Sequence, residues 1–195
     1  MKFLDSIRTD LAGFSRSEKL FVFFVMVIGF CTGAEFAITR PASSAIFISA
    51  FSASFLPWVW LATVPLNLLI VYLYNRFLPK TGPLKMVITF AAVAIGINGL
   101  CAILLPIFPK FIFFHFAWKD VYILFMFKQL WSMIHSTIQA NRAKYLYGMI
   151  FGMGTLGSIF GSTAPGFFAV EMGSERLFLL TAPIYGLLIP DVAAA

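Results

Sequence analysis

Long apolar runs with few charges constrain the fold of this chain more than any other feature of its sequence. Residues 41–75 contain no charged side chain, and residues 20–39 contain only Glu35. About 20 mostly apolar residues in a helix are enough to cross the hydrocarbon core of a bilayer. Only 11% of the 195 residues are charged and the mean hydropathy is +0.92, whereas a soluble domain carries about 25% charged residues. A globule of this size could not cover so much apolar surface, so we expect an all-α, polytopic transmembrane helical bundle.

Charged residues divide the chain into segments of spanning length. We expect a cytoplasmic amphipathic segment over residues 1–19, a transmembrane domain over residues 20–190 and a tail over residues 191–195. The transmembrane domain is predicted to contain five full spans and a short or truncated sixth. The five spans are bounded by the charged pairs Lys19 and Arg40, Arg40 and Arg76, Lys85 and Lys110, Asp120 and Arg142, and Lys144 and Glu171.

Two stretches leave alternatives open. Residues 41–54, which precede the second span, are small and polar enough to form either a helix extension or a re-entrant turn. The sixth run, between Arg176 and Asp191, is short for a span and is followed by alanines. It predicts either a truncated chain or a thinly anchored sixth helix.

The Lys and Arg residues outside the expected spans are divided unevenly between the two sides of the membrane. With the N-terminus in the cytoplasm, nine lie inside and four outside. Cytoplasmic loops carry such an excess, so we expect an integral, multi-pass protein of a bacterial inner membrane with a cytoplasmic N-terminus. Topology therefore accounts for most of the net charge of +6 without nucleic acid as a partner. The inner residues are Lys2, Arg8, Arg16, Lys19, Arg76, Lys80, Lys85, Arg142 and Lys144, and the outer ones are Arg40, Lys110, Lys119 and Arg176.

The sequence lacks the motifs of the common enzyme and metal-site classes. It contains no P-loop and no HExxH motif. Cys31 and Cys101 lie in apolar runs without metal-ligand spacing, which is typical of reduced packing residues. We therefore expect no enzymatic activity, no cofactor and no bound metal.

Polar residues recur along one face of the predicted fourth span. The members are spaced three or four apart and so share one helix face, with Trp131 beside them: Lys128, Ser132, His135, Gln139 and Arg142. A lipid-facing helix would not tolerate this stripe, so we expect it to face a bundle interior or a water-filled cavity and to bind or translocate a substrate. Two simpler interpretations stay open: Arg142 as a positive-inside anchor, and His135 as an interhelical hydrogen-bonding group.

Glu35 and Arg40 add two charges to the predicted first span. They are five residues apart, about 140° around a helix, so they do not pair with each other. We therefore predict that Glu35 pairs with Lys128 of the fourth span. Arg40 is a second candidate substrate-binding residue, with an interfacial anchor as the simpler alternative. The excess of cations over Glu35 favours an anionic ligand, since the arginine fork binds phosphate or carboxylate.

Glycines at helical spacing in the fifth span predict close helix packing. Gly148 and Gly152 form one GxxxG pair, and Gly157 and Gly161 form another. Residues 152–157 also match GxGxxG, but the dinucleotide fingerprint requires a preceding strand and a βαβ unit, which this apolar helix excludes.

Two stretches resemble a known family of carriers. AITRPASSAIFISAFSASFLPWVWLATVPLNLLIVYLYNRF is similar to the opening of the ATP/ADP translocases, nucleotide transporters of plastids and obligate intracellular bacteria that are related to the major facilitator superfamily. LWSMIHSTIQANRAKYLYGMIFGMGTLGSIFGS is similar to their fourth and fifth spans, so the resemblance covers residues 20–162. It implies an ATP-binding antiporter built from two six-helix halves, of which this chain is the N-terminal one.

The resemblance also implies residue roles. Arg40 corresponds to the arginine of the first-span motif, and Lys144 to the basic residue of the loop after the fourth span. Pro41 stands where the family has an acidic residue and Ser43 where it has a basic one, so a related carrier of another anion fits the pattern as well.

The function expected from these observations is secondary transport of a nucleotide or similar organic anion by exchange. Its partners would be the lipid bilayer, the anionic substrate, and either a C-terminal half or a second copy of the chain. A facilitator-type carrier for an unrelated solute, proton-coupled through Glu35, is one alternative. A non-transporting membrane scaffold or accessory subunit is the other.

Overall fold

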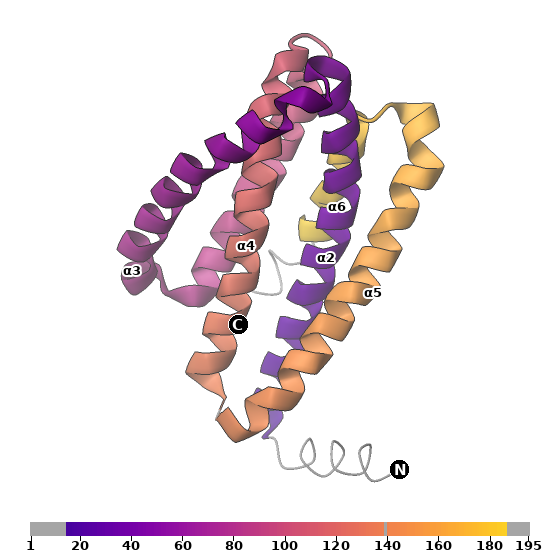
Figure 1. Ribbon diagram of the computed structural model, residues 1–195. Coiled ribbons are helices and arrows are strands. Elements are labelled where there is room, and N and C mark those ends of the chain that lie inside the picture. The colour runs from indigo at the N-terminus through magenta and orange to yellow at the C-terminus, as the bar shows by residue number, and fades with distance from the viewer. Residues whose placement is uncertain (1–14, 139, 187–195) are drawn as a thin grey trace.

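The computed structural model describes residues 15–138 and 140–186, and the side chains of these residues outside 140–145. Every regular element in these ranges is a helix (Figure 1). The elements are α2 (Arg16–Phe51), η1 (Ala53–Phe55), α3 (Leu56–Leu104), η2 (Pro109–Phe111), α4 (Ile112–Thr137), α5 (Ala140–Met172), η3 (Arg176–Leu180) and α6 (Thr181–Gly186). Most of the predicted amphipathic segment and all of the predicted tail lie outside the described residues.

Helix α2 is longer than the first predicted span. Its N-terminus is closed by a capping box, in which the Ser15 hydroxyl accepts from the Glu18 amide while the Glu18 carboxylate accepts from the Ser15 amide. It continues through Pro41 to Phe51, so residues 41–51 form a helix extension and not a re-entrant turn. The extension places Glu35 near the middle of the helix instead of near its end.

Helix α3 consists of two arms that reverse direction at Gly82. Gly82 has φ +76°, a conformation that glycine adopts without strain, and Pro83 follows it at the start of the second helical stretch. The first arm, residues 56–81, and the second arm, residues 83–104, correspond to the second and third predicted spans. Figure 1 shows the first arm running away from the bundle and the second returning to it.

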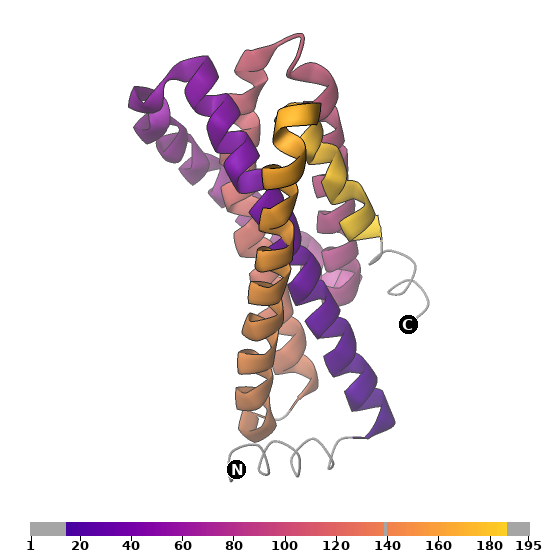
Figure 2. The same ribbon diagram turned by 90° about the vertical axis from the view of Figure 1, so that its right-hand side faces the viewer.

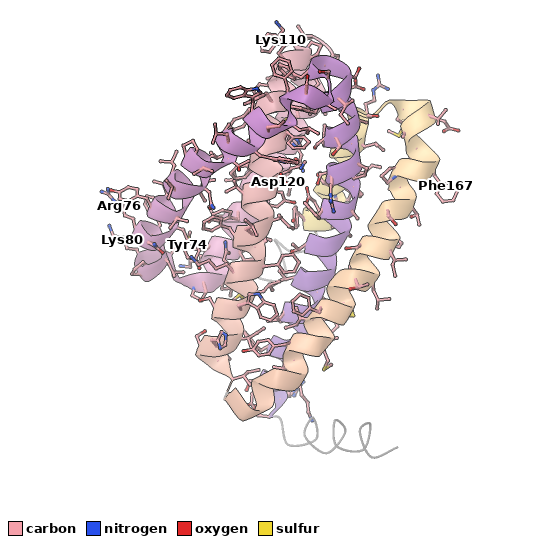
Figure 3. All side chains as sticks on the ribbon, viewed as in Figure 1. Tyr74, Arg76, Lys80, Lys110, Asp120 and Phe167 are labelled. Carbon is pink, nitrogen blue, oxygen red and sulfur yellow. The ribbon has the colours of Figure 1, made fainter. Side chains whose placement is uncertain are left out.

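Helices α4, α5 and α6 follow in alternating directions (Figures 1 and 2). Helix α4 begins at Ile112, eight residues before the predicted boundary at Asp120. Lys119 and Asp120 are therefore helical residues and not loop charges. Figure 3 places Lys110 at one end of the bundle and Arg76 and Lys80 at the far tip of α3.

Helices α2 and α5 pack backbone to backbone through small residues. A Cβ added at Gly33 would collide with the Gly154 carbonyl, one at Gly157 with the Phe30 carbonyl, and one at Gly161 with the Ala34 carbonyl. Glycine allows this approach, which increases the van der Waals contact between the two helix backbones. The Ser158 hydroxyl donates to the Gly33 carbonyl across the same interface at 3.2 Å.

Gly148 and Gly152 take no part in this interface, which corrects half of the glycine prediction. A Cβ at either position would meet nothing within 4 Å. The sequence pattern identifies small residues on a helix, but only the crossing of α5 over α2 determines which of them meet a neighbour.

Two helical stretches of the described chain are long and apolar enough to cross a membrane. They are Arg16–Phe51, whose most apolar 18-residue window has a mean hydropathy of 2.1, and Ala53–Leu104, whose window has 2.3. Only 33% of the most apolar window of the second stretch is buried. Large apolar side chains such as Trp58, Leu61 and Leu68 lie exposed on it, a surface that requires an apolar environment or a partner.

The α2–α5 contact predicts that glycine-to-alanine substitutions in α5 change stability in opposite directions, depending on whether the glycine faces α2. Gly157→Ala or Gly161→Ala should destabilise the chain by about 1–3 kcal/mol, because the new methyl group must displace the α2 backbone. Gly148→Ala and Gly152→Ala are the matched controls, and they should be neutral or stabilise by up to about 1 kcal/mol through helix propensity. Thermal unfolding midpoints of the detergent-solubilised variants measure the difference. Equal effects at all four positions would contradict the packing described above.

Candidate functional site

A buried hydrogen-bond network surrounds Glu35, whose side chain is 0% exposed. The Asn98 amide group donates to Glu35 Oε1 and to the Thr181 hydroxyl, both at 3.0 Å. This orientation leaves Asn98 Oδ1 as an acceptor, so His115 Nε2, at 2.9 Å, is the donor to it. His115 Nδ1 then accepts from the Ser43 hydroxyl at 3.0 Å. One chain of polar groups thus joins α2, the second arm of α3, α4 and α6.

Several buried side-chain polar atoms have no hydrogen-bond partner among the described residues. They are Glu35 Oε2, Thr32 Oγ1, Trp118 Nε1 and both side-chain amide atoms of Gln129. Buried groups of this kind are usually satisfied by ordered water or a ligand. Glu35 Oε2 and Thr32 Oγ1, one turn apart on α2, therefore leave unused hydrogen-bonding capacity at the buried carboxyl group.

The predicted pairing of Glu35 with Lys128 is wrong. Glu35 has its hydrogen bond from Asn98, and the ion pair within 4.0 Å found in the described part of the chain joins Lys119 to Asp120 at 2.7 Å. Lys128 is exposed, and its ammonium group lies 5.0 Å from the centre of the Tyr74 ring and 5.6 Å from that of Phe125. It is therefore held over aromatic rings between α4 and the first arm of α3, where a cation–π contact stabilises it.

The next two residues of the predicted polar stripe differ in their exposure. Ser132 is half-buried and His135 is exposed. A His135 ring nitrogen lies 3.2 Å from the Tyr147 hydroxyl of α5, which agrees with an interhelical hydrogen-bonding role. Trp131 packs against Tyr147 and Phe151 of the same helix, with ring centres 5.0 and 5.1 Å away.

The stripe does not continue along one helix to its predicted end. Helix α4 ends at Thr137 and α5 begins at Ala140, so the backbone of Arg142 belongs to α5. Helical spacing cannot place Arg142 on the face of Lys128 across this break. Gln139 and the side chain of Arg142 lie outside the described residues.

Arg40 lies exposed on α2, with its guanidinium 5.8 Å from the centre of the Phe36 ring. No acidic group of the described residues lies within 4.0 Å of it. Lys119 lies 3% exposed and is neutralised by Asp120. Arg40 and Lys128 are therefore two exposed cations, on two helices, without a carboxylate partner in the described chain.

Sequence reasoning missed the groups that partner Glu35. Asn98 is the one side-chain amide in the apolar run between Lys85 and Lys110. A polar side chain in the middle of a predicted span could have been identified as a partner for Glu35. His115 was hidden because the stretch between Lys110 and Asp120 was interpreted as a loop. Thr181 lies in the short sixth run, where composition carries no signal.

Comparison of the chain with known protein families, with curated proteins and with solved structures finds no match. The described residues also contain no group of three or more His, Cys, Asp or Glu side chains that could hold a metal ion. The chemistry available at the site is therefore that of exposed cations and a buried carboxyl group with hydrogen-bonding neighbours.

Asn98 should carry much of the stability of the buried network. Asn98→Leu is expected to destabilise the chain by about 1–3 kcal/mol, because it leaves Glu35, His115 and Thr181 buried without their partner. Asn67→Leu is the matched control, since Asn67 is half-buried on the other arm of α3 and makes no hydrogen bond to a described residue. Thermal unfolding midpoints of both variants test this, and equal midpoints would contradict a structural role for the network.

Proposed function

We propose that this chain is half of a facilitator-type secondary transporter that exchanges a nucleotide or a similar organic anion. The observation that carries the proposal is the pair of exposed cations, Arg40 and Lys128, that have no acidic partner in the described chain. A charge on a membrane helix is costly, so it is retained where it serves a substrate or ion pathway. Both residues lie on helices whose other residues are mostly apolar.

The anionic character of the substrate follows from the charges that remain after internal pairing. Asp120 neutralises Lys119, and Glu35 lies buried behind its Asn98 hydrogen bond. Among the charged candidate residues whose side chains the structure describes, the accessible groups are thus the Arg40 guanidinium and the Lys128 ammonium. A guanidinium binds two oxygens of a phosphate or carboxylate, and an ammonium adds a point charge. A nucleotide offers both phosphate for these groups and a base that could stack on aromatic side chains such as Trp131.

A polytopic arrangement is part of the same proposal. Six helical stretches of alternating direction would form one half of a two-half carrier, with the substrate bound between the halves near the middle of the membrane. The tip of α3 with Arg76 and Lys80 would lie on the cytoplasmic side of a bacterial inner membrane, and Lys110 on the other. A second copy of the chain or a separate C-terminal half would complete the pathway.

A proton-coupled carrier for another solute is the second candidate, and Glu35 is the observation that favours it. Its carboxyl group is fully buried, has one oxygen without a partner and has no cation within 4.0 Å in the described chain. Such a group can bind and release a proton as the surrounding helices move. Uptake driven by an imposed pH gradient, without substrate on the opposite side, would favour this candidate over exchange.

Nucleotide binding tests the proposed substrate. Labelled ATP or ADP should bind the purified chain in lipid nanodiscs, and Arg40→Ala or Lys128→Ala should each weaken binding at least tenfold through loss of a charge-assisted contact. Lys110→Ala removes a cation at the end of the bundle and should leave binding unchanged. Proteoliposomes preloaded with unlabelled ADP then test counterflow. Absence of both binding and exchange, or full binding by the Lys128→Ala variant, would refute the assignment.

Water access to α4 separates a carrier from a membrane scaffold. In a chain carrying Cys31→Ala and Cys101→Ala, the Ser132→Cys variant should react with a membrane-impermeant maleimide in intact proteoliposomes. Ile134→Cys is the matched control, since Ile134 is 0% exposed and should stay protected. Protection of both positions would favour the scaffold interpretation, in which the polar side chains of α4 form a dry protein contact.

A further inference from the structure

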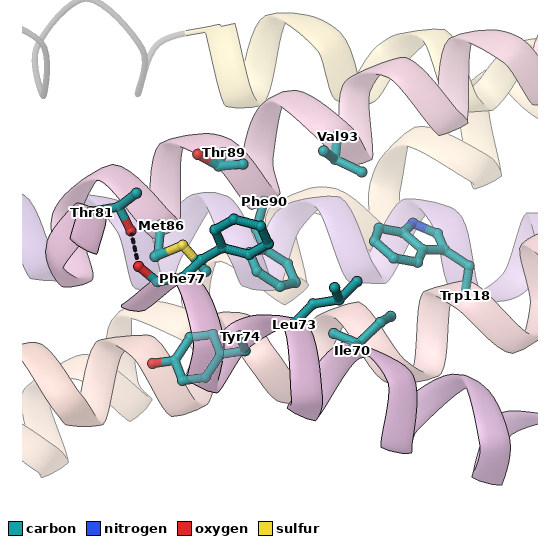
Figure 4. Close-up of a pocket in the computed structure, with 10 residues that line it drawn as sticks. All are labelled: Ile70, Leu73, Tyr74, Phe77, Thr81, Met86, Thr89, Phe90, Val93 and Trp118. Atoms are coloured by element: carbon teal, nitrogen blue, oxygen red, sulfur yellow. Dashed lines mark hydrogen bonds between the residues drawn. The ribbon is translucent and has the colours of Figure 1, made fainter. Parts of the chain in front are cut away.

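A groove of about 420 Å³ runs between the two arms of α3. Figure 4 shows Leu73 and Phe77 of the first arm opposite Met86 and Phe90 of the second, with Trp118 of α4 at the end remote from Thr81. The groove follows the first arm from Ile70 to Thr81, a length of about 16 Å at 1.5 Å per residue. It is therefore a long, narrow, laterally placed cleft.

The walls of the groove are suited to an apolar chain. The Tyr74, Phe90 and Phe125 rings pack together beneath it, with the Phe90 and Phe125 rings stacked 5.6 Å apart. The two hydroxyl groups of Thr81 and Thr89 donate to carbonyls of their own helices, at 3.0 and 2.8 Å. These two donors are therefore already used, whereas Trp118 Nε1 at the remote end of the groove has no partner among the described residues. The walls are otherwise mostly apolar.

Three cations lie near the turn that joins the two arms of α3, and the Arg76 guanidinium donates to the Tyr72 hydroxyl at 3.1 Å. Arg76, Lys80 and Lys85 lie exposed within six residues of Gly82, and Figure 3 shows Arg76 and Lys80 at the tip of α3. No acidic side chain that the structure describes lies within 4.0 Å of any of them. An apolar cleft thus ends at a cluster of uncompensated positive charge.

We propose that this groove binds an anionic phospholipid, with one acyl chain between the arms of α3 and the phosphate on Arg76, Lys80 and Lys85. Basic clusters of this kind at the cytoplasmic ends of membrane helices attract anionic headgroups. The inference requires that α3 lies in a membrane, but it does not require that the chain transports a nucleotide.

The test counts lipids retained by the protein in native mass spectrometry. The full chain is reconstituted in nanodiscs that contain equal amounts of phosphatidylglycerol and phosphatidylcholine with identical acyl chains, then released. Phosphatidylglycerol should be retained at least tenfold over phosphatidylcholine. The triple variant Arg76→Gln, Lys80→Gln, Lys85→Gln should lose this selectivity. The variant Arg16→Gln, Lys19→Gln, which removes cations from the end of α2, is the control and should keep it.

A groove-filling variant tests the acyl-chain position independently of the cations. Leu73→Trp should reduce the number of retained lipids while leaving the three basic residues intact, and Val93→Trp serves the same purpose if the first variant folds poorly. The proposal is overturned by equal retention of both lipids in the unaltered chain, or by unchanged selectivity in the triple variant. It is equally overturned by a dimer that retains no lipid, or by full retention in a folded groove-filling variant. None of these readouts depends on nucleotide exchange.

Discussion

The side chain of Asn98 holds the described helices in one arrangement. Its amide reaches Glu35 on α2, His115 on α4 and Thr181 on α6, so one residue connects four elements. Apolar side chains pack against lipid about as well as against each other, so they specify helix positions weakly in a membrane. A hydrogen-bond network has a defined geometry and cannot be satisfied by acyl chains. The network therefore determines which helix faces meet, and the apolar side chains fill the space between them.

The α2–α5 interface uses a different means to the same end. Gly33, Gly157 and Gly161 remove side chains from the crossing, so backbone lies on backbone. With α2 fixed on one side by α5 and on the other by the Asn98 network, its middle has little freedom. The first arm of α3, by contrast, buries few side chains, among them Val59, Ile70 and Tyr74, and leaves much apolar surface exposed. The cations proposed for the lipid lie at the tip of α3, away from the Asn98 network (Figure 3).

The separation of the buried network from the exposed cations affects how the Glu35 carboxyl group can act. Glu35 lies more than 4.0 Å from any cation of the described chain, so it forms no ion pair with Lys128. Its second oxygen, with Thr32 Oγ1 one turn away on α2, retains capacity for a water molecule or a proton. The proposed anion-binding surface and the proposed protonatable interior are therefore compatible in one bundle, since they use different groups.

What the sequence by itself determined was the all-helical class of fold and the presence of the long apolar helices. The apolar runs and the small residues of α5 act through local propensity and spacing, which can be read along the chain. The reversal at Gly82 and the ends of α2 and α4 were not predicted. Tertiary structure alone decided three features: the partner of Glu35, the end of the polar stripe at Thr137, and the absence of a neighbour at Gly148 and Gly152. Each depends on how helices cross and where α4 starts and stops. Residues such as Glu35 and Asn98 are 63 positions apart, and helical periodicity contains no information about contacts over that distance.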